Sequence, residues 1–195
     1  MGESAVALLV RRAELADAAA IASSNVRSWQ AGYADVISSD FLRDLGRNLP
    51  QHTLHWQTLI LGGEAEGRFM LVGEVDGEVA GHLSGGAYRG TDASEPPRGG
   101  AYRGTDAGEP PPGEVYACYV DPAHWRQGVG SALMACALER LAQAGYSQAA
   151  LWVLADNVGA RAFYEHHGWL ADGAHKIYEL AGERYPEVRY HRALP

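Results

Sequence analysis

The stretch from Glu114 to Leu141 reads as a strand, a glycine turn and a helix, and this order limits the possible folds more than any other feature. Residues 114–120 (EVYACYV) are apolar or aromatic on both faces, as in a central strand. Gly128 and Gly130 then stand at the mouth of an otherwise good helix. A glycine in a helix costs about 1 kcal/mol relative to alanine. The pattern therefore indicates that the main chain at these positions must lack a side chain.

A glycine turn that opens a helix presents unpaired N–H groups at the positive end of a dipole, which suits an anion such as phosphate. No lysine follows the glycines as a P-loop requires, and Gly128-Val129-Gly130-Ser131 lacks the third glycine of the dinucleotide fingerprint. The stretch also does not open an N-terminal βαβ unit. From these residues alone, two interpretations stay open: a phosphate site, or a turn without a ligand.

The rest of the chain alternates strands and helices around this motif. An Asp-Gly pair between apolar runs predicts a hairpin within residues 68–86. The order predicts a single domain of α/β (α+β) class, with a mixed sheet and helices on its faces. Buried strands are expected at 6–12 and 148–155, a central strand at 114–120, and a final antiparallel pair at 175–180 and 187–194. Expected helices lie within 14–34, 39–45, 51–61, 129–141 and 157–168.

Residues 85–112 hold a tandem duplication. The blocks 85–98 and 99–112 differ only at positions 94/108 and 98/112. Their Gly, Pro and Asp content buries little apolar surface, so we expect a flexible loop inserted into the single domain 1–195. An alternative is a substrate lid made by the pairs Tyr88-Arg89 and Tyr102-Arg103.

Composition excludes several other classes of protein. The formal net charge of -8 argues against a nucleic-acid partner. No apolar run approaches about 20 residues, and the N-terminus lacks the pattern of a signal peptide, so we expect no membrane association and a cytoplasmic location. Cys118 and Cys136 are expected to be free buried thiols. His52 and His55 share a helix face, but no nearby carboxylate or cysteine completes a metal site, so no metal is expected.

Four stretches, taken together, resemble the GNAT superfamily of N-acetyltransferases, in a bacterial branch. VYACYVDPAHWRQGVGSALM is similar to the acyl-CoA signature, and LWVLADNVGARAFYEHHGW to the second signature. VRSWQAGYADVISSDFL and PEVRYHRAL resemble the flanking segments. The resemblance covers most of the chain except the duplicated loop, and it implies a GNAT-like, mostly antiparallel sheet. One departure is Trp125, which stands where the family usually has Gln or Arg.

The resemblance implies acetyl-CoA as cosubstrate. Its pyrophosphate would lie on the main-chain amides of residues 126–131, and its pantetheine arm would pair with the strand edge where strand 114–120 splays from strand 148–155. The residues expected to bind it are Tyr119, Val120, Arg126, Gln127, Gly128, Val129, Gly130, Ser131, Asn157 and Arg161. For Asn157 the alternative is a helix cap, and both roles are compatible.

The expected chemistry is direct acyl transfer from the thioester to an amine. An amine with a pKa of about 10.4 is about 3 units from neutral at pH 7, so a general base helps. Glu114 lies at the same spacing from Gly128 as the glutamate base of some family members, and Tyr164 occupies the family's general-acid position. The alternatives are a solvated carboxylate at Glu114 and a purely packing role for Tyr164.

The acceptor is a small-molecule or peptide amine of unidentified kind. Trp29 and Tyr33 would line its entry together with Tyr116 and Tyr119, although core packing is the alternative for each of these rings. Two rival functions remain: the same fold using another acyl-CoA, and a non-catalytic acyl-CoA sensor. A generic binder of nucleotide phosphates is a third. A homodimer is possible.

Overall fold

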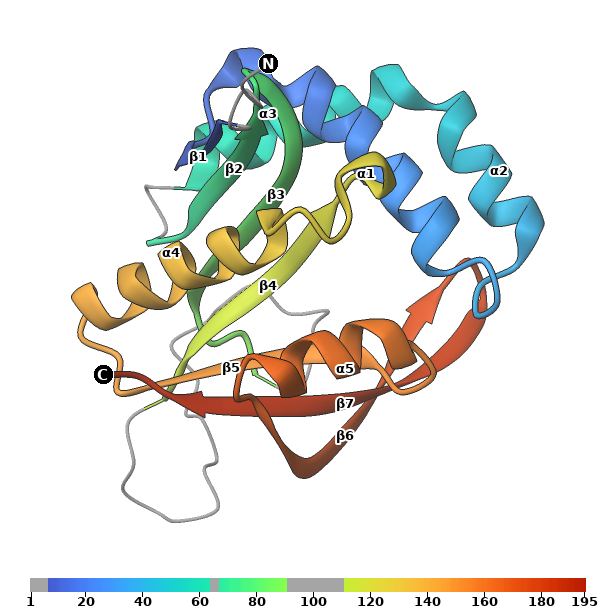
Figure 1. The fold of residues 1–195 in the computed structure, drawn as a ribbon. Helices are drawn as coiled ribbons and strands as arrows, with labels where there is room; N and C mark the ends of the chain where they lie inside the picture. The colour runs from blue at the N-terminus through green and yellow to red at the C-terminus, as the bar shows by residue number, and fades with distance from the viewer. Residues whose placement is uncertain (1–6, 64–66, 91–110) are drawn as a thin grey trace, which may run out of the picture. The chain divides into compact units, whose positions relative to one another are not determined.

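The computed structural model describes residues 7–63, 67–90 and 111–195 (Figure 1). They group into two compact units, drawn from Met1–Ser84 with Ala117–Ala137 and from Gly85–Tyr116 with Leu138–Pro195. The hydrogen-bonded strand order is β1-β2-β3-β4-β5-β7-β6, and β3 and β4 contribute to both units. The sheet is mostly antiparallel, and this confirms the expected fold class.

The first unit begins with an antiparallel set of strands. β1 (Leu8–Arg12) pairs with β2 (Phe69–Val75), and β2 turns into β3 (Glu78–Ala87). Asp76 and Gly77 join these two strands with φ angles of 51° and 86°. Two consecutive positive φ angles define the primed turn that the Asp-Gly pair predicts.

Three helices follow β1 in the chain. A short 3-10 turn, η1 (Leu15–Asp17), leads into α1 (Ala18–Gly32), and α2 (Ser39–Arg47) and α3 (Leu49–Gly63) come next. Ser38 caps α2 by accepting a hydrogen bond from the Phe41 amide. These helices confirm the three predicted from periodicity, and α3 extends two residues beyond the predicted range at each end.

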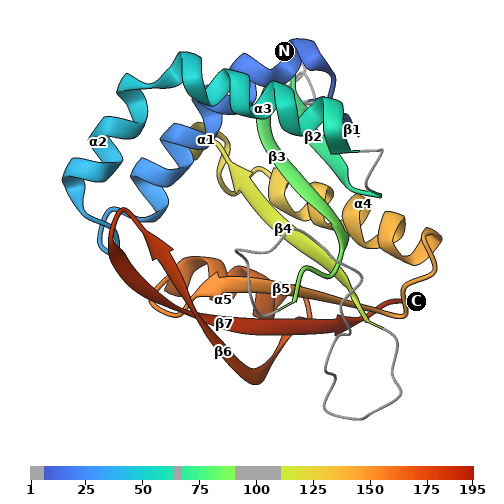
Figure 2. The same cartoon turned by 180° about the vertical axis from the view of Figure 1, so that it is seen from behind.

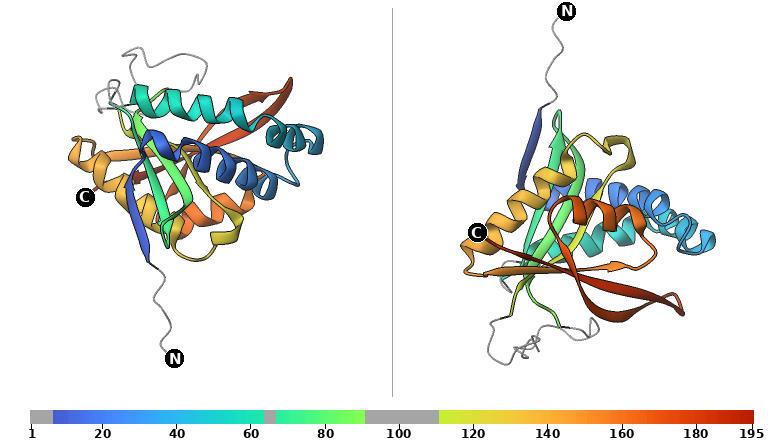
Figure 3. Two further views of the ribbon diagram at one scale, coloured as in Figure 1. Left: turned by 90° about the horizontal axis from the view of Figure 1, so that it is seen from above. Right: turned by 60° about the horizontal axis from the view of Figure 1, so that its bottom comes forward.

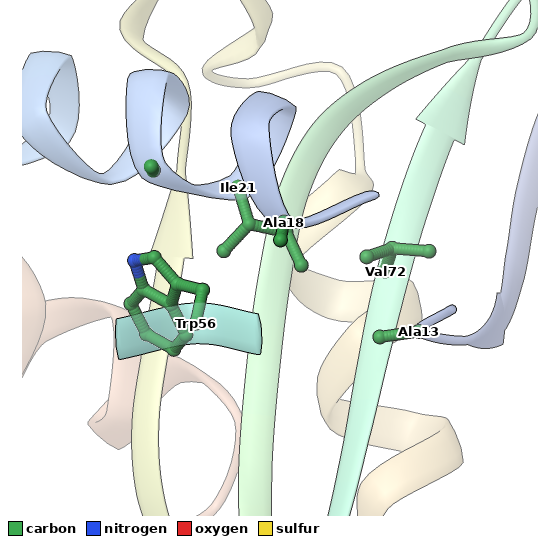
Figure 4. Packing of buried hydrophobic residues seen from close by; sticks show 6 residues of the cluster. Ala13, Ala18, Ile21, Trp56 and Val72 are labelled. Carbon is green, nitrogen blue, oxygen red and sulfur yellow. The ribbon is translucent and has the colours of Figure 1, made fainter. Parts of the chain in front are cut away.

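Neighbouring residues of β2 show how helices cover both faces of the first unit's strands. Val72 is fully buried in a cluster with Ile21 of α1 and Trp56 of α3, shown in Figure 4. A Cβ on the next residue, Gly73, would come within 2.9 Å of Val129 of α4 (Val129–Gln143). Successive strand residues point to opposite faces, so α1 and α3 cover one face and α4 the other. Figure 2 shows α3 lying over β2 and β3.

The first predicted strand forms, but it is not buried. Leu8 is 37% exposed and Leu9 54% exposed. β1 is the edge strand of the sheet and pairs with β2 alone, so an apolar run here covers less surface than it would at the centre. The apolar run alone could not distinguish these two positions.

Gly81 of β3 sits where the backbone of β4 (Gly113–Val120) comes unusually close. A Cβ at Gly81 would lie 2.8 Å from the Tyr119 carbonyl oxygen and 3.2 Å from the Val120 Cα. We expect Gly81→Ala to lower the free energy of unfolding by about 1–3 kcal/mol, because main chain cannot move aside as a side chain can. Urea denaturation measures this. Gly32→Ala, with nothing within 4 Å of the added Cβ, is the control and should cost nothing measurable.

The second unit contains the C-terminal strands. β5 (Gln148–Leu154) pairs in parallel with the start of β4 and antiparallel with β7 (Glu183–Ala193), which pairs with β6 (Leu170–Leu180). α5 (Val158–His166) lies along β5 and β7 (Figure 3). The last antiparallel pair is as predicted.

The duplicated stretch is not all loop. Residues 85–87 belong to β3, and the next two residues make specific contacts: the Tyr88 hydroxyl accepts a 2.9 Å hydrogen bond from Arg189, and Arg89 contacts Glu114. Tyr102 and Arg103 lie outside the described residues. None of the described helices is long and apolar enough to cross a membrane.

Candidate functional site

A tight turn connects β4 to α4 (Figure 1), and this turn together with the first residues of α4 contains six of the ten residues predicted to bind acetyl-CoA. The 3-10 helix η3 (Pro122–His124) follows β4, and the chain then bends through residues 125–128. Arg126 has φ 62° and Gly128 φ 84°. The left-handed region is open to glycine without a steric penalty. The backbone conformation therefore favours glycine at position 128, the first glycine of the motif.

Burial changes sharply where α4 begins. Val129 is fully buried, whereas Arg126, Gln127 and Gly128 are exposed. The Gly128 carbonyl accepts the 3.0 Å bond from the Ala132 amide that starts the helix. The amides of Val129 and Gly130 precede this first helical hydrogen bond and stand at the positive end of the helix dipole. This arrangement suits an anionic ligand.

Side chains of the first unit hold this turn in place. Asp121 is 5% exposed and accepts hydrogen bonds from the Ala123 amide (3.1 Å) and from Arg27 Nε (2.7 Å). Arg27 is thus an internal partner of the turn. The Gln127 side chain donates to the Ala123 carbonyl at 3.0 Å. Gln127 therefore folds back on η3, while the Arg126 side chain is exposed.

The main-chain groups at the end of β4 alternate in direction. The Asp121 amide donates to the Ala80 carbonyl of β3 at 2.8 Å, so main-chain groups two residues earlier, at Tyr119, also face β3. Those of Cys118 and Val120 face away. The Val120 carbonyl already accepts from Ser28 Oγ (2.8 Å) and Trp125 Nε1 (2.7 Å). Of the two β4 residues predicted to bind acetyl-CoA, Val120 thus has main-chain groups that face away from β3, as Cys118 does, whereas those of Tyr119 face β3.

Three of the predicted acceptor-side rings gather in the first unit. The Trp29 ring centroid lies 4.9 Å from that of Tyr33 and 6.1 Å from that of Tyr119. Phe41, which sequence reasoning did not select, lies 6.3 Å from Trp29. Trp29 and Tyr33 are only half-buried. The fourth ring, Tyr116, belongs to the second unit.

The predicted general acid, Tyr164, lies on α5 in the second unit. It is 8% exposed, and its ring centroid lies 6.3 Å from those of Trp169 and Tyr190 and 5.5 Å from that of Phe163. These rings fix the position of the Tyr164 side chain. Packing and catalysis are compatible here, because a proton donor benefits from a fixed orientation.

Asn157 and Arg161 both have partners within the second unit. The Asn157 side chain accepts from the Ala160 amide at 3.0 Å and so caps α5. Arg161 donates to the Tyr190 hydroxyl at 3.1 Å and to the Ala155 carbonyl at 3.0 Å. Both residues thus have structural roles, and any contact with coenzyme A would be additional.

The predicted general base, Glu114, is neither solvated nor isolated. Its side chain is 1% exposed and forms an ion pair with Arg89 at 2.7 Å. The Arg89 guanidinium lies 4.1 Å from the centroid of the Tyr116 ring. From the sequence, Arg89 was expected only as part of a possible lid. The structure instead places it between two predicted site residues.

Among the described residues, Cys118 and the histidines of α3 do not add a nucleophile or a metal site. Burial raises the pKa of the Cys118 thiol to about 12, so it is protonated at neutral pH and is a poor nucleophile. Within residues 7–63, 67–90 and 111–195, no three His, Cys, Asp or Glu side chains are grouped so that they could hold a metal ion. His52 and His55 both lie on α3.

Comparisons with known proteins agree with this arrangement. The model of the Acetyltransferase (GNAT) family matches residues 31–169. The uncharacterized N-acetyltransferase YuaI of Bacillus subtilis (strain 168) is 31% identical over 179 residues, which cover 92% of this chain and 89% of that protein. The chain therefore belongs to the GNAT family of acetyltransferases.

Solved structures share the fold. The PaiA N-acetyltransferase from Thermoplasma acidophilum, in complex with coenzyme A, superposes with a TM-score of 0.65 at 14% identity, covering 96% of this chain and 99% of that one. YncA from Salmonella typhimurium, solved with its cofactor acetyl-CoA, has a TM-score of 0.59 at 19% identity, covering 97% and 95%.

Proposed function

We propose that the protein transfers the acetyl group of acetyl-CoA to an amine by direct attack. The amine nitrogen bonds to the thioester carbonyl carbon, the carbon–sulfur bond breaks, and the products are an acetamide and the coenzyme A thiol. The amine loses one proton and the leaving thiolate gains one. The observation that carries this proposal is the exposed turn at residues 126–128, which opens α4 in a member of the GNAT family.

Groups in and next to the turn favour binding of a diphosphate. The net charge of -8 opposes an anionic ligand, so the amides that begin α4 and the exposed Arg126 must outweigh the global field. Gly128, Val129, Gly130 and Ser131 contribute main-chain groups. Gln127 stabilises the turn through η3 and is not needed as a direct ligand.

The pantetheine arm carries amides that can pair with a strand edge. We assign this pairing to the main chain of Cys118 and Val120, because their groups face away from β3. The Val120 carbonyl is engaged twice, so its amide is the available group. The Tyr119 side chain then contributes through its ring, next to Trp29.

Two side chains supply the proton transfers. Glu114 accepts the amine's proton through water, and Tyr164 donates the proton that the leaving thiolate needs. A phenol with a pKa of about 10 is well matched to a thiolate of similar basicity. Trp29, Tyr33 and Tyr116 supply aromatic surface for the acceptor.

The Gly128 backbone gives the first test. We expect Gly128→Ala to weaken coenzyme A binding about tenfold or more, because alanine at φ 84° costs about 1–2 kcal/mol and the turn relaxes away from its present shape. Calorimetric titration with coenzyme A measures this. Gly145→Ala is the matched control: its φ is 91°, so it carries the same strain outside the turn and should leave binding unchanged.

The reaction itself is tested by thiol release from acetyl-CoA with a panel of amines. Release that depends on the amine supports the proposal. Tight coenzyme A binding with no release across the panel would indicate an acyl-CoA sensor instead. Release only with longer acyl-CoA thioesters would indicate another acyl donor, and stronger stabilisation by a nucleotide than by coenzyme A would indicate a nucleotide-phosphate binder.

A further inference from the structure

Arg89 donates hydrogen bonds to both carboxylate oxygens of Glu114. The Arg89 main-chain amide donates to Glu114 Oε2 at 2.7 Å, while Nη2 (2.7 Å) and Nε (3.2 Å) of its side chain donate to Oε1. One carboxylate oxygen is thus held by main chain and the other by a guanidinium. The carboxylate is buried, yet the Arg89 side chain is 31% exposed.

The Arg89 guanidinium is in contact with the Tyr116 ring as well as with Glu114. Glu114 and Tyr116 are two residues apart on β4 and share a face. The Tyr116 hydroxyl donates to the Ala87 carbonyl at 2.7 Å, which fixes its ring, and the guanidinium carbon lies 4.1 Å from the ring centroid. A carboxylate beside the face of an aromatic ring is a general binding arrangement for organic cations.

The two carboxylate oxygens differ in what can replace their partners. If the Arg89 side chain swings outward, its main-chain amide still orients Glu114 through Oε2. The vacated Oε1 cannot stay bare, because a buried carboxylate without a counter-charge is strongly unfavourable. Another cation can therefore take the place of the guanidinium and restore the counter-charge.

We propose that Glu114 and Tyr116 form a binding site for a cationic amine, that Arg89 fills this site in the unliganded protein, and that the acceptor's ammonium group displaces the guanidinium. A guanidinium does not give up a proton in proteins, whereas an ammonium can. The exchange turns Glu114 from a blocked carboxylate into a proton acceptor. That last role rests on the proposed function; the cation site itself does not.

The proposal restricts the acceptors. Amines that are cationic at neutral pH compete for Glu114 and are also attracted by the net charge of -8. Amines that carry no positive charge cannot displace Arg89. The Arg89 side chain therefore occupies the cation site and excludes such acceptors from it.

The test removes the Arg89 side chain and supplies a small soluble guanidinium compound in its place. In Arg89→Ala, we expect millimolar methylguanidinium chloride to raise the melting temperature clearly above the effect of neutral N-methylurea at equal concentration and ionic strength. Wild type should show a smaller difference, because methylguanidinium must first displace the Arg89 side chain. The double variant Arg89→Ala/Glu114→Gln should show none. Arg89→Lys, which keeps a cation in place, should resemble wild type.

Equal effects of methylguanidinium and N-methylurea on Arg89→Ala would overturn the proposal. If this variant does not fold alone, its refolding yield with each of the two compounds gives the same comparison. Coenzyme A titration of wild type separates the two proposals: a methylguanidinium response without coenzyme A binding leaves the cation site standing and rejects the acetyltransferase function.

Discussion

Tyr164→Phe is expected to lower kcat about 100-fold or more while leaving the affinity for acetyl-CoA nearly unchanged. The substitution removes one hydroxyl and keeps the ring that packs against Trp169 and Tyr190. General acid catalysis typically contributes 10²- to 10⁴-fold, and an interaction used only in the transition state changes kcat rather than binding. Steady-state thiol release with a responsive amine measures both parameters.

Tyr178→Phe is the matched control. Tyr178 is a half-buried tyrosine of β6 in the same unit, and no role in the reaction is assigned to it. Its variant should keep wild-type kcat. If Tyr164→Phe also keeps it, Tyr164 serves packing alone, and the proton for the thiolate comes from another group or from water.

Acidification is expected to destabilise the protein through His82. This residue of β3 is fully buried between the rings of Trp56 and Tyr119, and neither ring nitrogen has a hydrogen-bond partner among the described residues. Burial lowers the pKa of His82 to about 3. Unfolded histidine has a pKa of about 6.5. Between these values the unfolded chain binds a proton that the folded chain does not, so stability falls as the pH decreases.

The expected loss of stability follows from the difference between the folded and unfolded pKa values of His82. From pH 7 to pH 5, wild type should lose about 2 kcal/mol more than His82→Phe, because each pH unit below 6.5 corresponds to about 1.4 kcal/mol. Urea denaturation at pH 7, 6 and 5 measures the difference. His175→Gln, at an exposed histidine of β6, should keep the wild-type pH dependence. A wild-type and His82→Phe difference that stays constant with pH would contradict the prediction.

Most helices, strands and turns of the fold could be predicted from local sequence patterns. The Asp76-Gly77 turn, the Ser38 and Asn157 caps and the glycine that opens α4 all depend on short-range chemistry. Turns and caps are specified by residues a few positions apart, so they can be predicted without knowledge of the tertiary fold. Strand and helix periodicity supplied the remaining elements.

Burial and partners could not be predicted in the same way. The apolar run of β1 gives no sign that the strand lies at an edge, and the alternation of β4 matters only once its neighbour β3 is known. Glu114 was predicted as a general base, with a solvated carboxylate at a strand end as the alternative, and neither prediction included a partner for it. The structure buries it under a residue 25 positions away, from the duplicated stretch.

The sequence by itself determined the family, the order of elements and the turn at Gly128, because these depend on residues close together in the chain. Only the tertiary structure decided that Arg89 covers Glu114, that Arg27 supports Asp121 and that His82 is buried without a partner. Long-range contacts set the charge and solvation around a side chain. Those surroundings, more than residue type, decide whether a carboxylate or an imidazole can take up a proton.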